Sequence, residues 1–268
     1  TQADAELALR DMLGAHSFGA ASARVVIEEF LAGEEASYIV MSDGRNVLPL
    51  ATSQDHKRRD EGDLGPNTGG MGAYSPAPVI TPAVETRILE QIIRPTIAGM
   101  AAEGVPFIGF LYAGLMIDAD GAPKVIEFNV RLGDPEAQPI LMRLKTDLLD
   151  LIEDALDGRL DRSVASWDAR PAIGVVVAAA GYPGKVRSGD VIDGLAVEPD
   201  PDVKVFHAAT ALDAQGRIVS AGGRVLTVCA RGADIAAARD KAYAATAEIG
   251  FTGAFWRRDI GHRALDRR

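Results

Sequence analysis

This chain of 268 residues has a single cysteine, no surplus of positive charge and no long apolar run. Cys229 has no partner for an internal disulfide, and its alternating surroundings predict a buried structural thiol rather than a nucleophile. The formal net charge of −10 argues against non-specific binding of nucleic acid, which needs a cationic surface. With no bilayer-spanning run and no secretory signal, we expect a cytoplasmic location and no membrane partner.

Several familiar catalytic motifs are also missing. The sequence contains no Ser/His/Asp set, no Cys/His ligand spacing and no CxxC motif, which argues against covalent catalysis and a zinc site. The glycine-rich segment at residues 65–76 lacks the lysine that a G-x-x-x-x-G-K-[ST] phosphate loop requires. His56 could titrate near neutrality, but its charged neighbours indicate that it helps to position charge.

The most informative stretch that is present covers residues 125–136. An apolar strand end leads into Glu127 and Asn129, and alternate side chains of a strand point to the same face. A carboxylate and an amide oxygen side by side suit Mg²⁺, which keeps its other coordination sites for phosphate and water. Arg131 then offers a planar fork for a carboxylate or phosphate. The alternative is an ordinary acidic strand end on the surface.

Two further segments suggest nucleotide binding. The turn at residues 25–35 presents backbone groups that could read the edge of an adenine, with Glu35 placed to accept from ribose hydroxyls. Its acids could equally be solvated surface. Lys57, Arg58 and Arg59 supply positive charge beside the glycine-rich residues 65–76, whose N–H groups could bind an anion. The alternative for this charge run is again a solvated face.

The periodicity of the chain predicts an α+β protein with two domains, divided near residues 167–171 into 1–168 and 169–268. Residues 52–78 read as a long polar loop. We expect helices over residues 4–13, 82–103, 141–156 and 235–249, and strands over residues 25–27, 38–41, 46–50, 109–117, 124–128, 173–180, 203–206, 218–220 and 224–230.

Together these segments resemble the ATP-grasp enzymes and, within them, the phosphoribosylamine–glycine ligase family. The motifs that carry the resemblance are residues 28–35, 54–58, 65–76, 109–112, 125–129 and 131–136, with weaker support from 181–184 and 220–224. The resemblance implies the C-terminal part of an ATP-grasp domain, an antiparallel sheet with helices, followed by a small β-rich C-terminal domain.

The resemblance also implies a reaction of de novo purine biosynthesis. ATP phosphorylates glycine, and the amine of 5-phosphoribosylamine attacks the glycyl phosphate to give glycinamide ribonucleotide, ADP and phosphate. The implied cofactors are ATP and Mg²⁺ or Mn²⁺. By position, the implied metal ligands are Glu127 and Asn129, the adenine site is Glu28, Glu29, Phe30 and Leu31, and the ribose ligand is Glu35. The implied catalytic residues are Arg131, Asp134 and Lys57, and the substrate site is Asp55, Gly69, Gly70, Met71, Gly72, Pro135 and Glu136.

The chain departs from the family pattern at its start. Family members begin with a domain that binds phosphoribosylamine and a segment whose lysines contact ATP phosphates, and neither is found in this sequence. We therefore expect the C-terminal part of such a ligase, inactive by itself, whose partner would be the remaining N-terminal part. The alternatives are a catalytically incomplete nucleotide-binding module and another ATP-grasp carboxylate–amine ligase or carboxylase subunit. Residues 65–76 and 131–136 count against the last.

Overall fold

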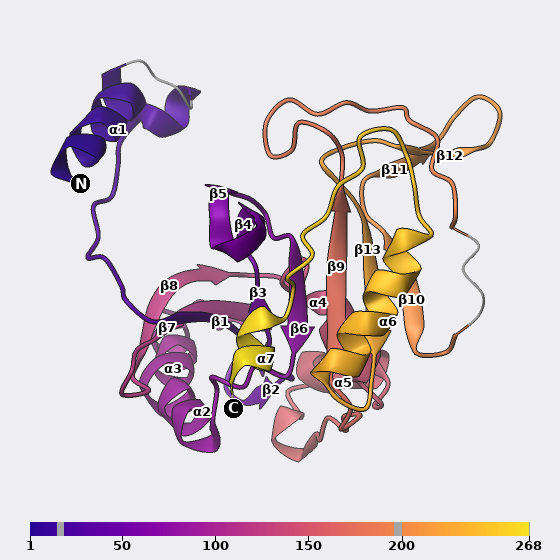
Figure 1. The fold of residues 1–268 in the computed structure, drawn as a ribbon. Coiled ribbons are helices and arrows are strands. Elements are labelled where there is room, and N and C mark those ends of the chain that lie inside the picture. The colour runs from indigo at the N-terminus through magenta and orange to yellow at the C-terminus, as the bar shows by residue number, and fades with distance from the viewer. Residues whose placement is uncertain (15–18, 196–199, 268) are drawn as a thin grey trace. The chain divides into compact units, whose positions relative to one another are not determined.

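The computed structural model describes residues 1–14, 19–195 and 200–267 (Figure 1). The chain forms two units, Thr1–Ala32 and Gly33–Arg268. The first unit contains α1 (Gln2–Gly14), which confirms the expected first helix, and the 3₁₀ turn η1 (Gly19–Ala23). The strand expected at residues 25–27 is wrong. Val26 and Ile27 are 85% and 78% exposed, and the apolar run pairs with no strand among the described residues.

The second unit begins with a four-stranded antiparallel sheet in the order β2-β1-β7-β8. Its strands are β1 (Glu34–Asp43), β2 (Val47–Pro49), β7 (Ile108–Ile117) and β8 (Pro123–Asn129), which confirms the four strands expected there. The β7–β8 hairpin turns at Asp118, whose Oδ1 accepts from the N–H groups of Asp120 and Ala122. Gly121 completes the turn at φ +71°, a conformation that glycine adopts without strain.

One face of this sheet is apolar. Ala36, Tyr38 and Val40 of β1 alternate with the side chains of the opposite face, as strand geometry requires, and pack against a helical layer. That layer consists of α2 (Pro82–Ile88), the π-helical turn η3 (Leu89–Ile93) and α3 (Arg94–Ala102). The side chain of Thr81 caps α2 by accepting from the N–H of Val84. The π turn has a local cause, because Pro95 has no N–H to donate to the preceding turn.

The opposite face is divided along its length. At one end, Met41 and Phe110 pack under α5 (Leu148–Leu156), while the other end carries the polar residues described below. The helix expected over residues 141–156 is wrong as a single element. It is split into α4 (Ala137–Arg143) and α5 because Leu144 is extended and bridges to Trp167, and Asp147 caps α5 anew.

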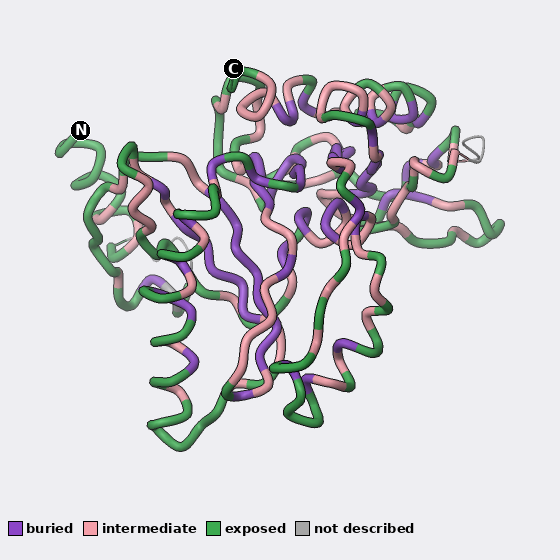
Figure 2. Tube along the Cα trace, turned by 90° about the horizontal axis from the view of Figure 1, so that it is seen from below, coloured by how far each residue is buried: buried purple, intermediate pink, exposed green. Residues whose placement is uncertain are grey.

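A second antiparallel sheet has the order β10-β13-β9-β6-β3. Its members are β3 (Gln54–Asp55), β6 (Gly72–Ser75), β9 (Ala172–Ala178), β10 (Val203–His207) and β13 (Arg224–Arg231). It confirms three of the four strands expected in the C-terminal part, and the fourth, at residues 218–220, forms in a separate hairpin. α6 (Ile235–Ala247) packs against the second sheet (Figure 1), and Cys229 is fully buried in β13. β9 and β13 are buried over most of their length, and the buried stretches of the chain are purple in Figure 2.

The long loop expected at residues 52–78 is wrong, because this stretch contributes β3 and β6 to the second sheet. Glycine makes this possible: a Cβ on Gly72 would lie 2.6 Å from the carbonyl oxygen of Gly174 on the next strand. The intervening residues form the hairpin β4 (Arg58–Asp60) and β5 (Leu64–Asn67) around the 3₁₀ turn η2 (Glu61–Asp63). The second sheet thus takes strands from both sides of residue 168, and the division into two domains there stays a prediction.

The remaining elements are short. They are the 3₁₀ turn η4 (Leu160–Arg162), the hairpin strands β11 (Thr210–Leu212) and β12 (Ile218–Ser220), and α7 (His262–Asp266). None of the helices that the structure describes combines the length and apolar character of a membrane span.

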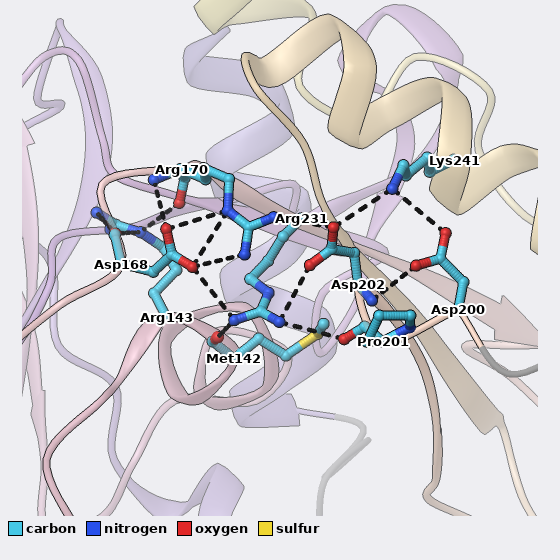
Figure 3. Close-up of polar contacts among 9 residues, drawn as sticks. All are labelled: Met142, Arg143, Asp168, Arg170, Asp200, Pro201, Asp202, Arg231 and Lys241. Carbon is cyan, nitrogen blue, oxygen red and sulfur yellow. Dashed lines mark hydrogen bonds and ion pairs between the residues drawn. The ribbon is translucent and has the colours of Figure 1, made fainter.

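An ionic network fastens residues 168–170 to the second sheet (Figure 3). Asp168 accepts from Arg170 at 2.8 Å and from Arg231 at 3.3 Å, and both arginines also meet Asp202. Arg143, which is 7% exposed, donates to the backbone oxygens of Asp168 and Arg170. Asp168 therefore compensates two cations at once.

Asp168→Asn is expected to lower the free energy of unfolding by about 2 kcal/mol at pH 7. Hydrogen bonds from Arg170 hold the pKa of Asp168 well below its ordinary value. A depressed pKa stabilises the fold above the unfolded pKa of about 3.9, and this contribution is lost as pH falls below it. Urea titrations should therefore show the wild type and the variant converging in acid. Asp193→Asn is the control, since Asp193 is exposed; an equal effect there would contradict the expectation.

Candidate functional site

The polar end of the first sheet places polar residues from three strands on one face. Ser37 of β1 lies opposite Gly114 of β7, which lies opposite Glu127 of β8. A Cβ on Gly114 would lie 3.2 Å from Cγ of Glu127, so the missing side chain leaves room for that carboxylate to lie over β7. The residues that share this face are Glu35, Ser37, Tyr112, Gly114, Glu127 and Asn129.

Glu127 and Asn129 fit a divalent cation that also binds other ligands. Both are hard oxygen donors on one strand face, and Glu127 is exposed. No cluster of three or more His, Cys, Asp or Glu ligands exists in the described part of the chain. The pair therefore suits an ion that completes its shell with phosphate and water, as Mg²⁺ does, and not an all-protein metal cage.

A second group of charges lies next to this face. Nζ of Lys57 is 2.7 Å from Oδ2 of Asp55 and 3.9 Å from Oε1 of Glu35. Burial alone would lower the pKa of Lys57, but the charge and hydrogen bond of Asp55 outweigh it, so the pKa is raised and Lys57 stays protonated. The side chain of Asp55 is 1% exposed, and Lys57 is the cation that compensates it.

Glu136 completes this group. It is 2% exposed, and Oγ of Ser37 donates to its Oε1 at 2.9 Å. Burial, reinforced by the charge of Asp55, raises the pKa of Glu136 to about 7. Burial and Asp55 likewise raise the pKa of Glu35. Three carboxyl groups thus surround the single ammonium of Lys57, and the arrangement can accept a second cationic group such as a substrate amine.

We expect Glu136 to make stability fall as pH rises from about 4.5 to 7. Its folded pKa of about 7 lies above the unfolded value, so the folded state binds more protons in this window and loses relative stability as they leave. Glu136→Gln should remove this slope, on the order of 3 kcal/mol across the window. Thermal unfolding at closely spaced pH values measures it. An unchanged slope in the variant would show that Glu136 is ionised throughout.

The glycine-rich segment meets the Asp134–Pro135 turn beside this group. A Cβ on Gly70, at φ +114°, would lie 2.4 Å from Cδ of Pro135, so only glycine fits this approach. Gly69, Met71 and Gly72 follow the same path, with Met71 fully buried. The structure therefore brings together the residues assigned to the substrate site by resemblance, but Met71 presents no side chain to a ligand.

Two residues at this junction were not predicted. Nη1 of Arg224 donates to the backbone oxygens of Gly69 and Asp134, and its Nη2 donates to Oδ2 of Asp134 at 2.9 Å. The N–H of Gly69 donates to Oη of Tyr182 at 2.8 Å. Asp134, expected beside the reacting groups, is thus already paired. Both residues fall in the weaker family motifs at 181–184 and 220–224, and membership in these motifs was the only sequence signal for their role.

The last of the predicted site residues are Arg131 and the residues of the expected adenine site. Arg131 is exposed, and its Nη1 donates to the backbone oxygen of Leu132 at 2.9 Å. No ion pair is recorded for Arg131 in the described part of the chain, so the rest of its guanidinium can meet an anion. Glu28, Glu29, Phe30 and Leu31 belong to the first unit, where Phe30 is 94% exposed. Their role at an adenine stays a prediction.

The two antiparallel sheets, with a carboxylate–amide pair on an open sheet face, define the ATP-grasp class of fold. A biotin carboxylase domain of a thermophilic 2-oxoglutarate carboxylase shares this fold with a TM-score of 0.60 at 17% identity, over 85% of this chain and 49% of that one. The family model described as phosphoribosylglycinamide synthetase, ATP-grasp (A) domain, matches residues 1–137, and the C domain of the same synthetase matches residues 172–263. The chain belongs to the phosphoribosylglycinamide synthetase family.

Named relatives agree with this assignment. The phosphoribosylamine–glycine ligase of Allochromatium vinosum is 62% identical over 99% of this chain, and that of Salmonella typhimurium is 58% identical over all of it. The crystal structure of the ligase from Thermotoga maritima matches with a TM-score of 0.77 at 36% identity, over 87% of this chain and 57% of that one. The chain spans 62% of the length of each of these two curated relatives.

Proposed function

We propose that the gene product carrying this chain ligates glycine to 5-phosphoribosylamine with ATP, giving glycinamide ribonucleotide, ADP and phosphate. The proposal rests on the closeness of two sites. The first is the pair of oxygen donors Glu127 and Asn129, and the second is the group of three carboxyl side chains around the single ammonium of Lys57. The first suits a nucleotide phosphate with its cation, and the second suits a substrate amine. The family assignment narrows that amine to glycine and phosphoribosylamine.

The chain's residues can be given roles in this reaction. Glu127 and Asn129 would hold Mg²⁺ or Mn²⁺, which when bound neutralises charge on the transferring phosphate. Asp55 and Glu136 would orient the ammonium of glycine, so that its carboxylate faces the nucleotide. Arg131 would bind the anionic groups, Lys57 would neutralise charge between the acids, and Glu35 would bind the nucleotide ribose.

The chemistry then needs no covalent protein intermediate. An oxygen of the glycine carboxylate attacks the γ-phosphorus of ATP, and ADP leaves. The amine nitrogen of 5-phosphoribosylamine then attacks the carbonyl carbon of glycyl phosphate, phosphate leaves, and the nitrogen loses a proton. The protein's part is to position these groups and stabilise charge. The adenine site at Glu28, Glu29, Phe30 and Leu31, the cytoplasmic location and the domains 1–168 and 169–268 belong to the same proposal.

A phosphate-release assay on the gene product tests it. We expect release in the presence of MgATP to require both glycine and phosphoribosylamine, and mass spectrometry to detect glycinamide ribonucleotide. Release with alanine in place of glycine at the same kcat/KM would contradict the substrate assignment.

A second candidate is a nucleotide-binding module without turnover. The length of the chain, 62% of its curated relatives, favours this for the 268 residues in isolation. Under that alternative, ADP binding measured by calorimetry would be retained and weakened by Glu127→Ala, with no phosphate release under any substrate combination.

A further inference from the structure

The C-terminal strap, defined as residues 257–267, lies against the segment that carries Asp55 and Lys57. Nη1 of Arg257 donates to the backbone oxygen of Arg58 at 3.0 Å and to Oδ1 of Asp63 at 2.9 Å. Nη2 of Arg263 donates to the other oxygen of Asp63 at 2.7 Å. Two arginines from the end of the chain thus hold one carboxylate near residue 60.

Further contacts extend the strap along the same segment. The N–H of Gly62 donates to Oδ2 of Asp259 at 2.8 Å, and the N–H of Gly261 donates to Nε2 of His56 at 3.3 Å. Arg267 pairs with Glu34, the neighbour of Glu35 in β1. The strap therefore contacts residue 34, residue 56 and the turn at 62–63, which lie around the acidic group formed by Glu35, Asp55 and Glu136.

Asp63 is held by both its backbone conformation and its ion pairs. Its φ is +56°, which is rare for a residue with a side chain, and the adjacent Gly62 is at φ +68°. Arg257 is bound by Asp259 at its Nε and Nη2, but its side chain is only 1% exposed, so solvent cannot replace Asp63 as the partner of its Nη1. Burial would raise the pKa of Asp63, but the hydrogen bonds from Arg263 and Arg257 hold it at about 2. The charge pair thus persists at any pH near neutrality.

His56 links this constraint to the acidic group. It stands between Asp55 and Lys57, is fully buried, and packs its ring against His262 at a centroid distance of 5.3 Å and Tyr74 at 5.8 Å. Burial and the nearby Arg257 and Arg263 lower its pKa to about 3, so the ring is neutral and Nε2 can accept from Gly261. The N–H of His56 donates to the backbone oxygen of Gly72 at 2.9 Å, and the N–H of Met71 donates to the backbone oxygen of His56 at 2.8 Å.

We propose that the C-terminal strap is a positioning element, which through Asp63 and His56 fixes the Asp55–Lys57 pair for the amine substrate. The placement of the pair is a structural inference, and only the step from placement to substrate affinity rests on the proposed function. No strap residue is assigned a contact with substrate or metal.

Asp63→Asn tests the proposal, because asparagine also tolerates positive φ while the charge is removed. In the gene product, we expect hydrogen exchange at the amides of His56 and Met71 to rise about tenfold, while the amides of β13 are unchanged. Arg263→Gln, at a partly exposed position, should act in the same direction without a risk of misfolding. Glu61→Gln and Arg258→Gln are the controls, since both residues are exposed neighbours.

Kinetics give the second readout. The KM for glycine should rise about tenfold in Asp63→Asn, with the KM for ATP unchanged, as expected for a displaced amine site. Unchanged exchange at His56 and Met71, or an equal rise throughout β13, would overturn the strap. Faster local exchange in a protein that never uses glycine would leave the strap standing and refute the proposed function instead.

Discussion

Glu127→Gln is expected to lower MgATP-dependent turnover of the gene product at least about a hundredfold, or ~2.7 kcal/mol of transition-state stabilisation. The substitution removes one charged oxygen donor from the Glu127–Asn129 pair and keeps the shape of the side chain. Since Glu127 is exposed and hydrogen bonding within β8 uses only its backbone, the midpoint of thermal unfolding should change little. The effect would therefore fall on cation and nucleotide binding alone.

Steady-state kinetics over a magnesium titration measure this effect. We expect the apparent magnesium constant to rise, and excess Mn²⁺ to recover part of the activity because it binds nitrogen and oxygen donors more tightly. Glu103→Gln, an exposed acid beyond α3, is the matched control. Full activity of Glu127→Gln at limiting magnesium would show that Glu127 is not a ligand of the metal.

Lys57→Met is expected to destabilise the fold by about 2 kcal/mol and to abolish turnover. The substitution leaves the carboxylate of Asp55, 1% exposed, without its cation, and uncompensated buried charges typically cost 3–5 kcal/mol. The smaller figure applies because Lys57 itself is 28% exposed, so water compensates part of the loss. Chemical denaturation at pH 7 gives the free energy.

The double variant Lys57→Met with Asp55→Asn separates charge from packing. Removing both partners should restore most of the lost stability and none of the activity, since the amine site loses its anion as well. Lys145→Met, at an exposed lysine, is the control. If the double variant were as unstable as Lys57→Met, the cost would arise from packing of the lysine chain and not from the buried carboxylate.

The local parts of this fold could be predicted from sequence. β1, β7, β8 and β13 are seven to ten residues long and rich in apolar residues, so they can be recognised from the sequence without knowledge of their partners. The prediction for residues 52–78 failed because β3 and β6 are only two and four residues long. β6 is defined by pairing with β9, which lies about a hundred residues later, and β3 is defined by pairing with β6. Glycine there serves close strand packing, a role that resembles a loop in sequence.

The residues of the site also differ in how far the local sequence predicts them. The Glu127–Asn129 pair follows from spacing on one strand. The raised pKa of Glu136 depends on its burial and on the charge of Asp55, which lies more than 80 residues away in sequence, and no local pattern reports such an environment. Contacts with residues far away in sequence define the roles of Arg224, Tyr182 and the strap arginines. The sequence around each of them therefore gives only a weak signal.

Transfer of oxygen from glycine to phosphate tests the proposed reaction most directly. When the gene product turns over glycine labelled with ¹⁸O in both carboxylate oxygens, together with phosphoribosylamine and MgATP, each phosphate released should carry one labelled oxygen. The label must move because phosphorylation of the carboxylate leaves its bridging oxygen on phosphate when the amine attacks. Phosphate without ¹⁸O, formed alongside glycinamide ribonucleotide, would contradict a glycyl phosphate intermediate and with it the roles assigned to this site.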